Sequence, residues 1–342
     1  MVFLAEEEVF LDSHPQHRAQ FLVDKLFEII GHLRDEGRCI VYITHKMDEV
    51  FRIADEITVF RDGKYIGTYD AAATDQKELI RLMVDRDITE MYPVRTSQPG
   101  EVVLSVRDLR QDGVFEKLSF DLHKGEILGF SGLMGAGRTE LMSAIFGVTK
   151  PTGGEIIIKG KRVTRPVPNR MISNGIGYVT EDRQGNGLVL SMNVEDNVII
   201  SSLARLSTKL GFVHKHSAHT ECADFIQKLR IKTPSHTTIV QNLSGGNQQK
   251  VILAKWLMRS PDVIIFDEPT RGIDVGAKSE IYHLVAELAA QGKGIIFISS
   301  EMPEVLGMCD RIVVLHEGKY SGTIDIQDAT QEKLLAMATG AA

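Results

Sequence analysis

The chain has 342 residues, a formal net charge of −7 and no long run of basic residues. This length allows two domains with buried cores, and the charge disfavours non-specific binding to phosphate backbones, so we expect no nucleic-acid partner. The sequence has neither an apolar stretch of the ~18 to 20 residues that cross a bilayer nor a basic N-terminal end followed by an apolar core, so any membrane role must come through partners.

The first third of the chain predicts a small, incomplete unit. Residues 1 to about 22 are polar and irregular, and His14-Pro15 disfavours a regular element there. From residue 24 to about 92 the pattern predicts a helix, a strand, a helix, short strands around Gly63 and a helix over 79–85. We therefore expect residues 1–95 to form one unit.

The rest of the chain predicts a complete domain. The run Thr96-Ser97-Gln98-Pro99-Gly100 is typical of a linker, so residues 96–100 should separate the first unit from a domain at 101–342. Within this domain we expect a β-rich part over about 101–165, an α-rich insertion over about 180–245 and then a return to a parallel sheet.

A glycine-rich loop lies between a predicted strand at 127–130 and a predicted helix at 139–146. It fits G-x-x-x-x-G-K-[ST], except that arginine replaces lysine. Its glycines would let the backbone wrap phosphates, and the threonine hydroxyl would ligate Mg²⁺. The predicted nucleotide-binding residues of this P-loop are Gly132, Gly135, Ala136, Gly137, Arg138 and Thr139.

A second glycine pair stands at the start of a predicted helix. In Leu243-Ser244-Gly245-Gly246-Asn247-Gln248-Gln249-Lys250, backbone N–H groups and the positive helix end would face an anion. Alone, such a tripeptide is a common turn; its order relative to the P-loop favours a phosphate site. We expect Ser244, Gly245, Gly246 and Gln248 to bind nucleotide.

Two adjacent carboxylates follow a third apolar strand, in Val263-Ile264-Ile265-Phe266-Asp267-Glu268. Asp267 would hold Mg²⁺ and Glu268 would orient the water that attacks the γ-phosphate. In isolation the segment also fits a buried strand that ends in a solvated acidic turn. The three motifs constrain one another, so we expect Glu268 to be catalytic.

Together these segments resemble the ATP-binding subunits of ABC transporters, and more narrowly the second half of the tandem ATPase subunit of bacterial monosaccharide importers, which include ribose, galactose, xylose and arabinose systems. The resemblance is carried by Arg138 and by the runs at 243–250, 268–278 and 299–304, and it covers nearly all of the chain after about residue 23. It implies an α/β P-loop NTPase fold with a β-rich subdomain and an α-helical insertion, preceded by a partial copy of the same domain. It also implies ATP and Mg²⁺ as ligands.

The sequence repeats internally. Residues 37–45 align with 292–300, an offset of 300 − 45 = 255, and the register then continues without a gap through Gly63-Lys64-Tyr65 and Gly318-Lys319-Tyr320. Such self-similarity predicts two ATPase units in tandem.

In this register, the first copy lacks the residues that would bind and hydrolyse ATP. Asp267 corresponds to Asp12, whereas Glu268 corresponds to Ser13, and no P-loop or Ser-Gly-Gly run precedes them. We expect this unit to be the C-terminal remnant of a first domain, shortened by truncation and a local rearrangement or reading-frame change.

Further roles follow from the resemblance. Glu181 stands where ABC ATPases commonly carry a Mg²⁺-sensing glutamine, although a charged surface turn is an equal alternative. The switch position is His45 in the first copy and Ser300 in the second, and serine is a poor replacement for a histidine that contacts the γ-phosphate. Phe115 is the candidate for adenine stacking, with a core role as the favoured alternative. Arg138 keeps a positive charge but is planar and forked, which favours nucleotide binding over fast turnover.

The resemblance implies the energising subunit of a monosaccharide importer, for a ribose-like pentose or a hexose. Its partners would be membrane permease subunits and, indirectly, a periplasmic sugar-binding protein, and it would lie in the cytoplasm against the inner face of the membrane. Cys39, Cys222 and Cys309 lack metal-ligand spacing, which fits reduced residues in a reducing cytosol.

ABC ATPases hydrolyse ATP between two units, so this chain would need self-pairing or another ABC ATPase to complete a site. Two alternatives stay open: a soluble tandem ABC protein that acts on ribosomes or DNA, and a regulatory remnant that binds nucleotide without hydrolysing it efficiently.

Overall fold

The computed structural model describes residues 15–44, 47–61, 64–75, 78–79, 82, 91–94 and 98–341. The chain divides into two compact units, Met1–Asp85 and Arg86–Ala342. Of the residues discussed above, Asp12, Ser13, His14, His45, Gly63, Thr96 and Ser97 lie outside the described residues, as does most of the helix expected at 79–85.

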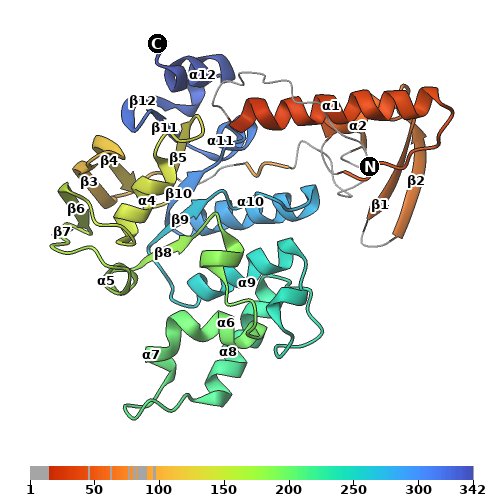
Figure 1. The fold of residues 1–342 in the computed structure, drawn as a ribbon. Coiled ribbons are helices and arrows are strands. Elements are labelled where there is room, and N and C mark those ends of the chain that lie inside the picture. The colour runs from red at the N-terminus through yellow and green to blue at the C-terminus, as the bar shows by residue number, and fades with distance from the viewer. Residues whose placement is uncertain are drawn as a thin grey trace. The chain divides into compact units, whose positions relative to one another are not determined.

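The described part of the smaller unit includes two helices and a hairpin (Figure 1), which are α1 (Pro15–Asp35), α2 (Met47–Ile53), β1 (Glu56–Arg61) and β2 (Lys64–Asp70). The strands pair antiparallel, with Glu56 opposite Asp70, and Ile57, Val59 and Leu79 form a small core. The expectation of irregular structure up to about residue 22 is wrong for residues 15–22, because α1 begins at Pro15, and its first part, residues 1–14, lies outside the described residues. Proline suits the first helical position, since its φ is preset and its missing N–H is not needed there.

The internal repeat is visible in the structure. Helix α11 (Met302–Met308) and the hairpin of β11 (Arg311–His316) and β12 (Lys319–Asp325) have the bounds of α2, β1 and β2 shifted by 302 − 47 = 255 residues. Both hairpins also carry a register shift at the same place, between Val59 and Phe60 and between Val314 and Leu315. The two segments therefore fold alike, as the sequence repeat predicts.

One predicted strand of the smaller unit is not formed among the described residues. The segment that aligns with β10 (Gly294–Ile298) is irregular, and its Val41 and Ile43 are 88% and 92% exposed. The aligned Ile296 and Ile298 are buried, because β10 pairs with a strand on each side. A strand needs such partners for its backbone groups, so the sequence pattern alone does not make one.

The larger unit holds two sheets. A four-stranded antiparallel sheet has the order β4-β3-β6-β7 and forms the expected β-rich part. Its strands are β3 (Val102–Gln111), β4 (Phe115–His123), β6 (Gly153–Ile158) and β7 (Lys161–Arg162). Gly154 at the start of β6 has a φ of +93°, and a side chain there would meet the backbone of Leu109 at 2.4 Å. Glycine thus allows β6 to approach β3 closely.

The six-stranded sheet has the order β12-β11-β5-β10-β9-β8, in which all strands but β12 run parallel. Its remaining strands are β5 (Ile127–Gly132), β8 (Ile176–Val179) and β9 (Val263–Asp267). All five residues of β9 are buried, and such continuous apolar strands are typical of parallel sheets covered on both faces. The carboxyl ends of β5, β10 and β9 therefore meet at one edge, where ligands bind in open α/β sheets.

Helices surround this sheet and form the insertion (Figure 1). The insertion contains α6 (Val194–Ile199), the 3₁₀ helix η3 (Ile200–Ser202), α7 (Leu203–Leu206) and α8 (Lys215–Lys228). The other helical segments are α4 (Arg138–Phe146), α5 (Pro168–Ser173), η2 (Arg183–Gly187), η4 (Val240–Asn242), α9 (Gly245–Leu257), α10 (Val275–Ala290), η5 (Ile326–Asp328) and α12 (Gln331–Thr339). The predicted α/β fold with a β-rich subdomain and a helical insertion is confirmed.

The larger unit includes residues before the linker expected at 96–100. The Tyr92 ring lies 5.2 Å from that of Tyr282 and against Gly307, where a side chain would collide with it. Gly100 donates its N–H to the carbonyl of Lys124 at 2.8 Å. This unit thus packs residues from at least Met91 onward against its core.

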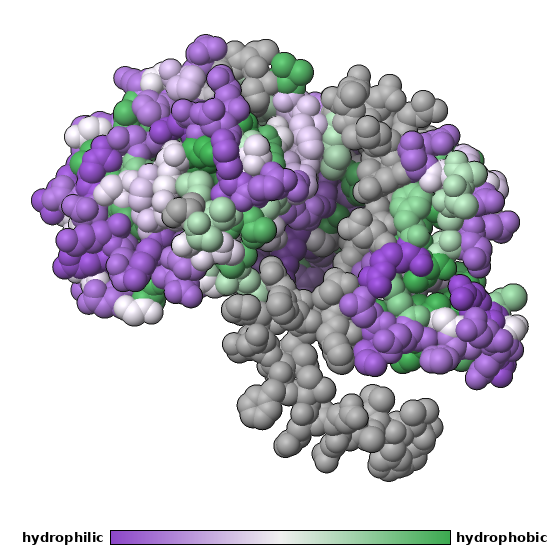
Figure 2. Space-filling view, turned by 90° about the horizontal axis from the view of Figure 1, so that it is seen from above, coloured by the Kyte–Doolittle hydropathy of each residue, from purple (hydrophilic) through white to green (hydrophobic). Residues whose placement is uncertain are grey.

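The described helices include none that is long and apolar enough to cross a membrane. Figure 2 shows one face of the larger unit as mostly hydrophilic, with hydrophobic residues in separate small areas. Scattered apolar residues of this kind are normal on a protein surface.

Candidate nucleotide-binding site

The P-loop joins β5 to α4 by a backbone path that glycine makes possible. Gly135 and Gly137 have φ values of +80° and +90°, which cost other residues about 1–2 kcal/mol. Gly137 is the N-cap of α4, and no side chain caps this helix. The N–H groups of its first turn therefore face the loop without a side-chain acceptor, as an anion site requires.

Thr139 and Asp267 lie together at the edge of the sheet. The Thr139 hydroxyl donates to Asp267 Oδ1 at 3.2 Å, and the Tyr178 hydroxyl donates to Oδ2 at 2.9 Å. Asp267 is fully buried, and its burial raises the pKa of the carboxyl above the ordinary value. A hydroxyl and a carboxylate are the hard oxygen donors that Mg²⁺ prefers, so these two residues fit the ion.

Glu268 adopts a strained backbone next to Asp267. Its φ is +47°, a value that is uncommon for residues other than glycine. Its N–H donates to the carbonyl of Ile298 at 3.0 Å. The Ser300 hydroxyl donates to Glu268 Oε2 at 3.1 Å. Burial raises the pKa of Glu268 to about 7, although Arg138 and Ser300 oppose this shift. A carboxyl poised near neutral pH is suited to accept a proton.

Arg138 reaches across the P-loop towards the same residues. Its Nη1 donates to the carbonyl of Ser299 at 3.0 Å, and its Nη2 lies 3.9 Å from Glu268 Oε1. The side chain is only 11% exposed. The guanidinium therefore lies between a carbonyl and the carboxylate expected to be catalytic.

A buried carboxylate, that of Glu304, accepts a hydrogen bond from the Ser299 hydroxyl and from other donors around it. It accepts hydrogen bonds from the hydroxyls of Thr270, Tyr282 and Ser299 at 2.6 to 2.8 Å and from Lys278 Nζ at 3.0 Å. In the sequence, Glu304 is part of the run at 299–304 that carries the family resemblance, and no separate role is predicted for it. Because its donors come from three separate segments, the loop after β9, α10 and the end of β10, no local pattern could have predicted this network.

The Ser-Gly-Gly run begins α9, with Ser244 as its N-cap. Asn247 Nδ2 donates to Ser244 Oγ at 2.9 Å, whereas the buried Gln248 donates to the carbonyl of Val240 at 3.2 Å. Arg183 donates to the carbonyl of Gly245 at 3.0 Å, a contact that sequence reasoning missed. In the described part of the chain, no hydrogen bond joins residues 244–248 to the P-loop.

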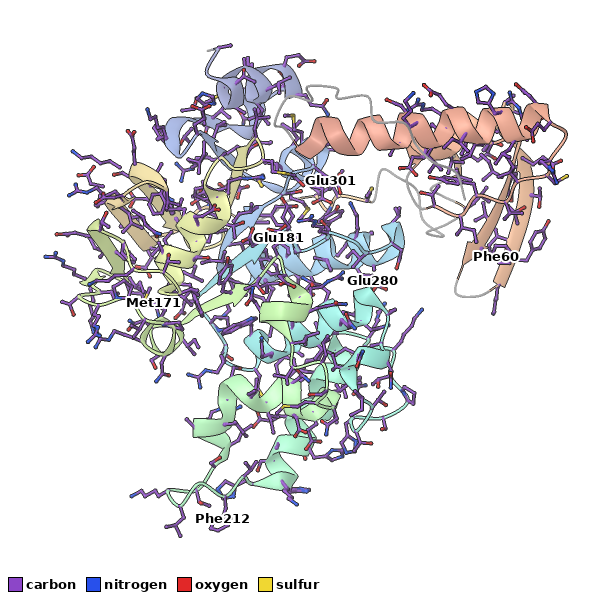
Figure 3. The ribbon with its side chains drawn as sticks, viewed as in Figure 1. Phe60, Met171, Glu181, Phe212, Glu280 and Glu301 are labelled. Atoms are coloured by element: carbon purple, nitrogen blue, oxygen red, sulfur yellow. The ribbon has the colours of Figure 1, made fainter. Side chains whose placement is uncertain are left out.

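The structure also gives the contacts or burial of two further candidate residues, Glu181 and Phe115. Glu181 follows β8, lies in the middle of the larger unit (Figure 3) and forms an ion pair with Arg271. Phe115 is 3% exposed and belongs to the core, in agreement with the core role favoured over adenine stacking.

Comparison with known families agrees with this geometry. The ABC transporter family model matches residues 115–271. A galactose/methyl galactoside import ATP-binding protein of Photobacterium profundum is 50% identical over 92% of the chain and 64% of its own length. A ribose import ATP-binding protein of Bacillus licheniformis is 49% identical over 93% of the chain and 64% of its own length. The chain thus spans less than two thirds of these relatives.

Solved structures share the fold at low sequence identity. A nucleotide-free ATP-binding cassette from an ABC transporter has a TM-score of 0.61 at 20% identity and covers 69% of this chain and 98% of its own. A solved ADP conformation of an ATP-binding cassette has a TM-score of 0.60 at 21% identity, over 70% of this chain and 99% of its own. The protein therefore contains an ABC-type ATPase domain with a P-loop NTPase fold, and it is a relative of the ATP-binding proteins of bacterial monosaccharide import.

Proposed function

We propose that this chain binds Mg-ATP and is the energising subunit of an importer for a monosaccharide, a ribose-like pentose or a hexose. The observation that carries the proposal is the hydrogen bond between Thr139 and Asp267, which joins the P-loop to the acidic end of β9. Relatives at about 50% identity, which are named for the import of galactose and ribose, suggest the substrate class.

Each residue of the site has a distinct task in this proposal. The P-loop glycines and the N-terminus of α4 hold the phosphates, and Thr139 and Asp267 hold Mg²⁺, with Glu181 as a further candidate near the ion. When bound, Mg²⁺ neutralises charge on the phosphate oxygens. Glu268 orients the attacking water and accepts its proton, while Ser300 fixes the carboxylate through the 3.1 Å hydrogen bond.

Arg138 favours binding over turnover. To contact a phosphate, its guanidinium must exchange the Ser299 carbonyl and the nearby Glu268 for phosphate oxygens. The guanidinium can bind phosphate tightly through bidentate hydrogen bonds, but it is wider than the ammonium group of the lysine expected in this loop. A slow or regulatory nucleotide-binding subunit is therefore the second candidate function, and this contact of Arg138 is the observation that favours it.

A complete catalytic site requires a second ATPase unit. Residues Ser244 to Gln248 begin α9 and make no hydrogen bond to the P-loop within the described chain, so we assign them to the nucleotide of a partner unit. That partner is a second copy of this chain or another ABC ATPase. Residues 1–95 would derive from a first domain of the same kind.

The helical insertion is the proposed contact with the membrane permease. Between α7 and α8 it exposes Leu210 and Phe212, which are 84% and 72% exposed, and Phe212 projects from the tip of the insertion (Figure 3). Exposed apolar residues at a loop tip suit a partner surface. The chain would then lie on the cytoplasmic face of the membrane, and a periplasmic sugar-binding protein would act through the permease.

Mg-ATP affinity of the purified chain tests the nucleotide site. We expect Thr139→Ala to lower the affinity at least about tenfold in Mg²⁺ and to change it little in EDTA, because the hydroxyl acts through the ion. Thr164→Ala replaces an exposed threonine and is the matched control. Equal Mg-ATP affinities for both variants would contradict the proposed site, and failure to copurify with a coexpressed permease would contradict the importer role.

A further inference from the structure

Two histidines and a glutamate from three segments of the helical insertion converge away from the P-loop. Glu195 is in the first turn of α6, His219 is on α8, and His236 lies in the turn that precedes η4. Glu195 Oε2 lies 3.0 Å from His219 Nδ1 and 3.7 Å from His236 Nε2. One ligand atom from each residue falls within 4.8 Å of the other two, and the imidazole centroids are 4.2 Å apart.

The backbone holds these side chains in place. The N–H of Glu195 donates to the carbonyl of His236 at 3.0 Å, and Val194 donates to Thr238 at 3.0 Å. Ser235 and Thr238 close the turn around His236 with further hydrogen bonds. Helices α6 and α8 lie side by side (Figure 1), and their contact fixes the distance between Glu195 and His219. The three groups are therefore arranged before any ligand arrives.

Their accessibility and chemistry fit a metal ion. The side chain of Glu195 is 19% exposed, and those of His219 and His236 are 49% and 37% exposed, so an ion can enter from solvent and still be partly shielded. Two imidazole nitrogens and one carboxylate form a common ligand set for Zn²⁺, with a fourth position left to water. Cys222, one turn along α8, stays a buried thiol, because burial raises its pKa to about 12, and it is not part of the set.

We propose that Glu195, His219 and His236 form a Zn²⁺ site. The bound ion would link α6, α8 and the turn that contains His236 to one another. The site shares no residue with the nucleotide site. Its existence therefore does not depend on the proposed importer function.

Metal binding by the full-length protein tests the proposal. After removal of metals with a chelator, we expect one equivalent of Co²⁺ to give the visible absorption bands of tetrahedral coordination and one equivalent of Zn²⁺ to displace it. Zn²⁺ should also raise the unfolding temperature, whereas Mg²⁺ at the same concentration should not. Each of His219→Ala and His236→Ala should weaken Zn²⁺ binding at least about tenfold, since even outer-shell partners contribute that much.

Two controls keep the result interpretable. His216→Ala removes an exposed histidine of the same helix and should leave Zn²⁺ affinity unchanged. Glu195→Gln keeps the size of the side chain, so it should weaken binding while the metal-free protein unfolds at nearly the same temperature as the parent. Absence of stoichiometric Zn²⁺ binding would overturn the proposal, as would binding that persists in the His219 and His236 variants or is lost in Thr139→Ala.

Discussion

Replacing Glu268 with glutamine should stabilise the larger unit at alkaline pH, because the buried, charged carboxylate lowers the free energy of unfolding. Burial raises the pKa of Glu268 to about 7 from the ordinary 4.5. The carboxyl is protonated in both states well below pH 4.5, so it contributes no pH dependence there. Between 4.5 and 7 the unfolded chain releases its proton first, and the free energy of unfolding falls as the pH rises. Above pH 7 the full cost, about 3 kcal/mol, is present.

Glutamine carries no charge at any of these pH values, so Glu268→Gln should add about 3 kcal/mol of stability at pH 8 and less than about 1 kcal/mol at pH 5. For a unit of this size that corresponds to roughly 6–12 °C in unfolding temperature at pH 8. Calorimetry without nucleotide at both pH values measures the difference. Glu317→Gln, which changes a carboxylate that is 84% exposed, should shift stability by no more than about 0.5 kcal/mol. Equal effects of Glu268→Gln at pH 5 and pH 8 would refute the reasoning.

Three other substitutions probe the surroundings of the site. Glu304→Ala leaves four donor groups without their buried acceptor and should destabilise the protein by about 3–5 kcal/mol in urea denaturation; a loss below about 1 kcal/mol would mean that water replaces the carboxylate. Gly137→Ala should cost about 1–2 kcal/mol and weaken Mg-ATP binding, whereas Gly113→Ala, also at positive φ, should cost stability alone; equal ATP affinities would contradict the P-loop assignment. Arg138→Lys should increase the ATPase rate with little change in Mg-ATP affinity, and an unchanged rate would show that arginine does not limit turnover.

The elements that bear the P-loop and the acidic strand end were predictable because their signals are local. A buried strand, a glycine-rich turn and a helix follow one another within about twenty residues at 127–146, and parallel strands bring such turns to one edge of a sheet. The likeness of the two hairpins was predictable from the repeat, since the same residue pattern folds in the same way at an offset of 255.

The remaining features depend on contacts between distant segments. The exposed Val41 and Ile43 have the residue pattern of β10 but lack neighbouring strands among the described residues, so no strand forms. The contact of Arg138 with the Ser299 carbonyl depends on how β10 lies beside β5. Likewise, His219 and Glu195 are 24 residues apart, a separation that predicts no metal site from sequence.

The most direct test of the proposed nucleotide site is to measure Mg-ATP affinity and ATP turnover of the purified chain beside Arg138→Ala and Glu268→Gln. We expect tight Mg-ATP binding that is lost in Arg138→Ala and retained in Glu268→Gln, with weak turnover or none in the parent chain. Binding that persists unchanged in Arg138→Ala would contradict the role given to the P-loop arginine. Fast turnover that Glu268→Gln abolishes would show instead that two copies of the chain complete an active site and that arginine supports catalysis.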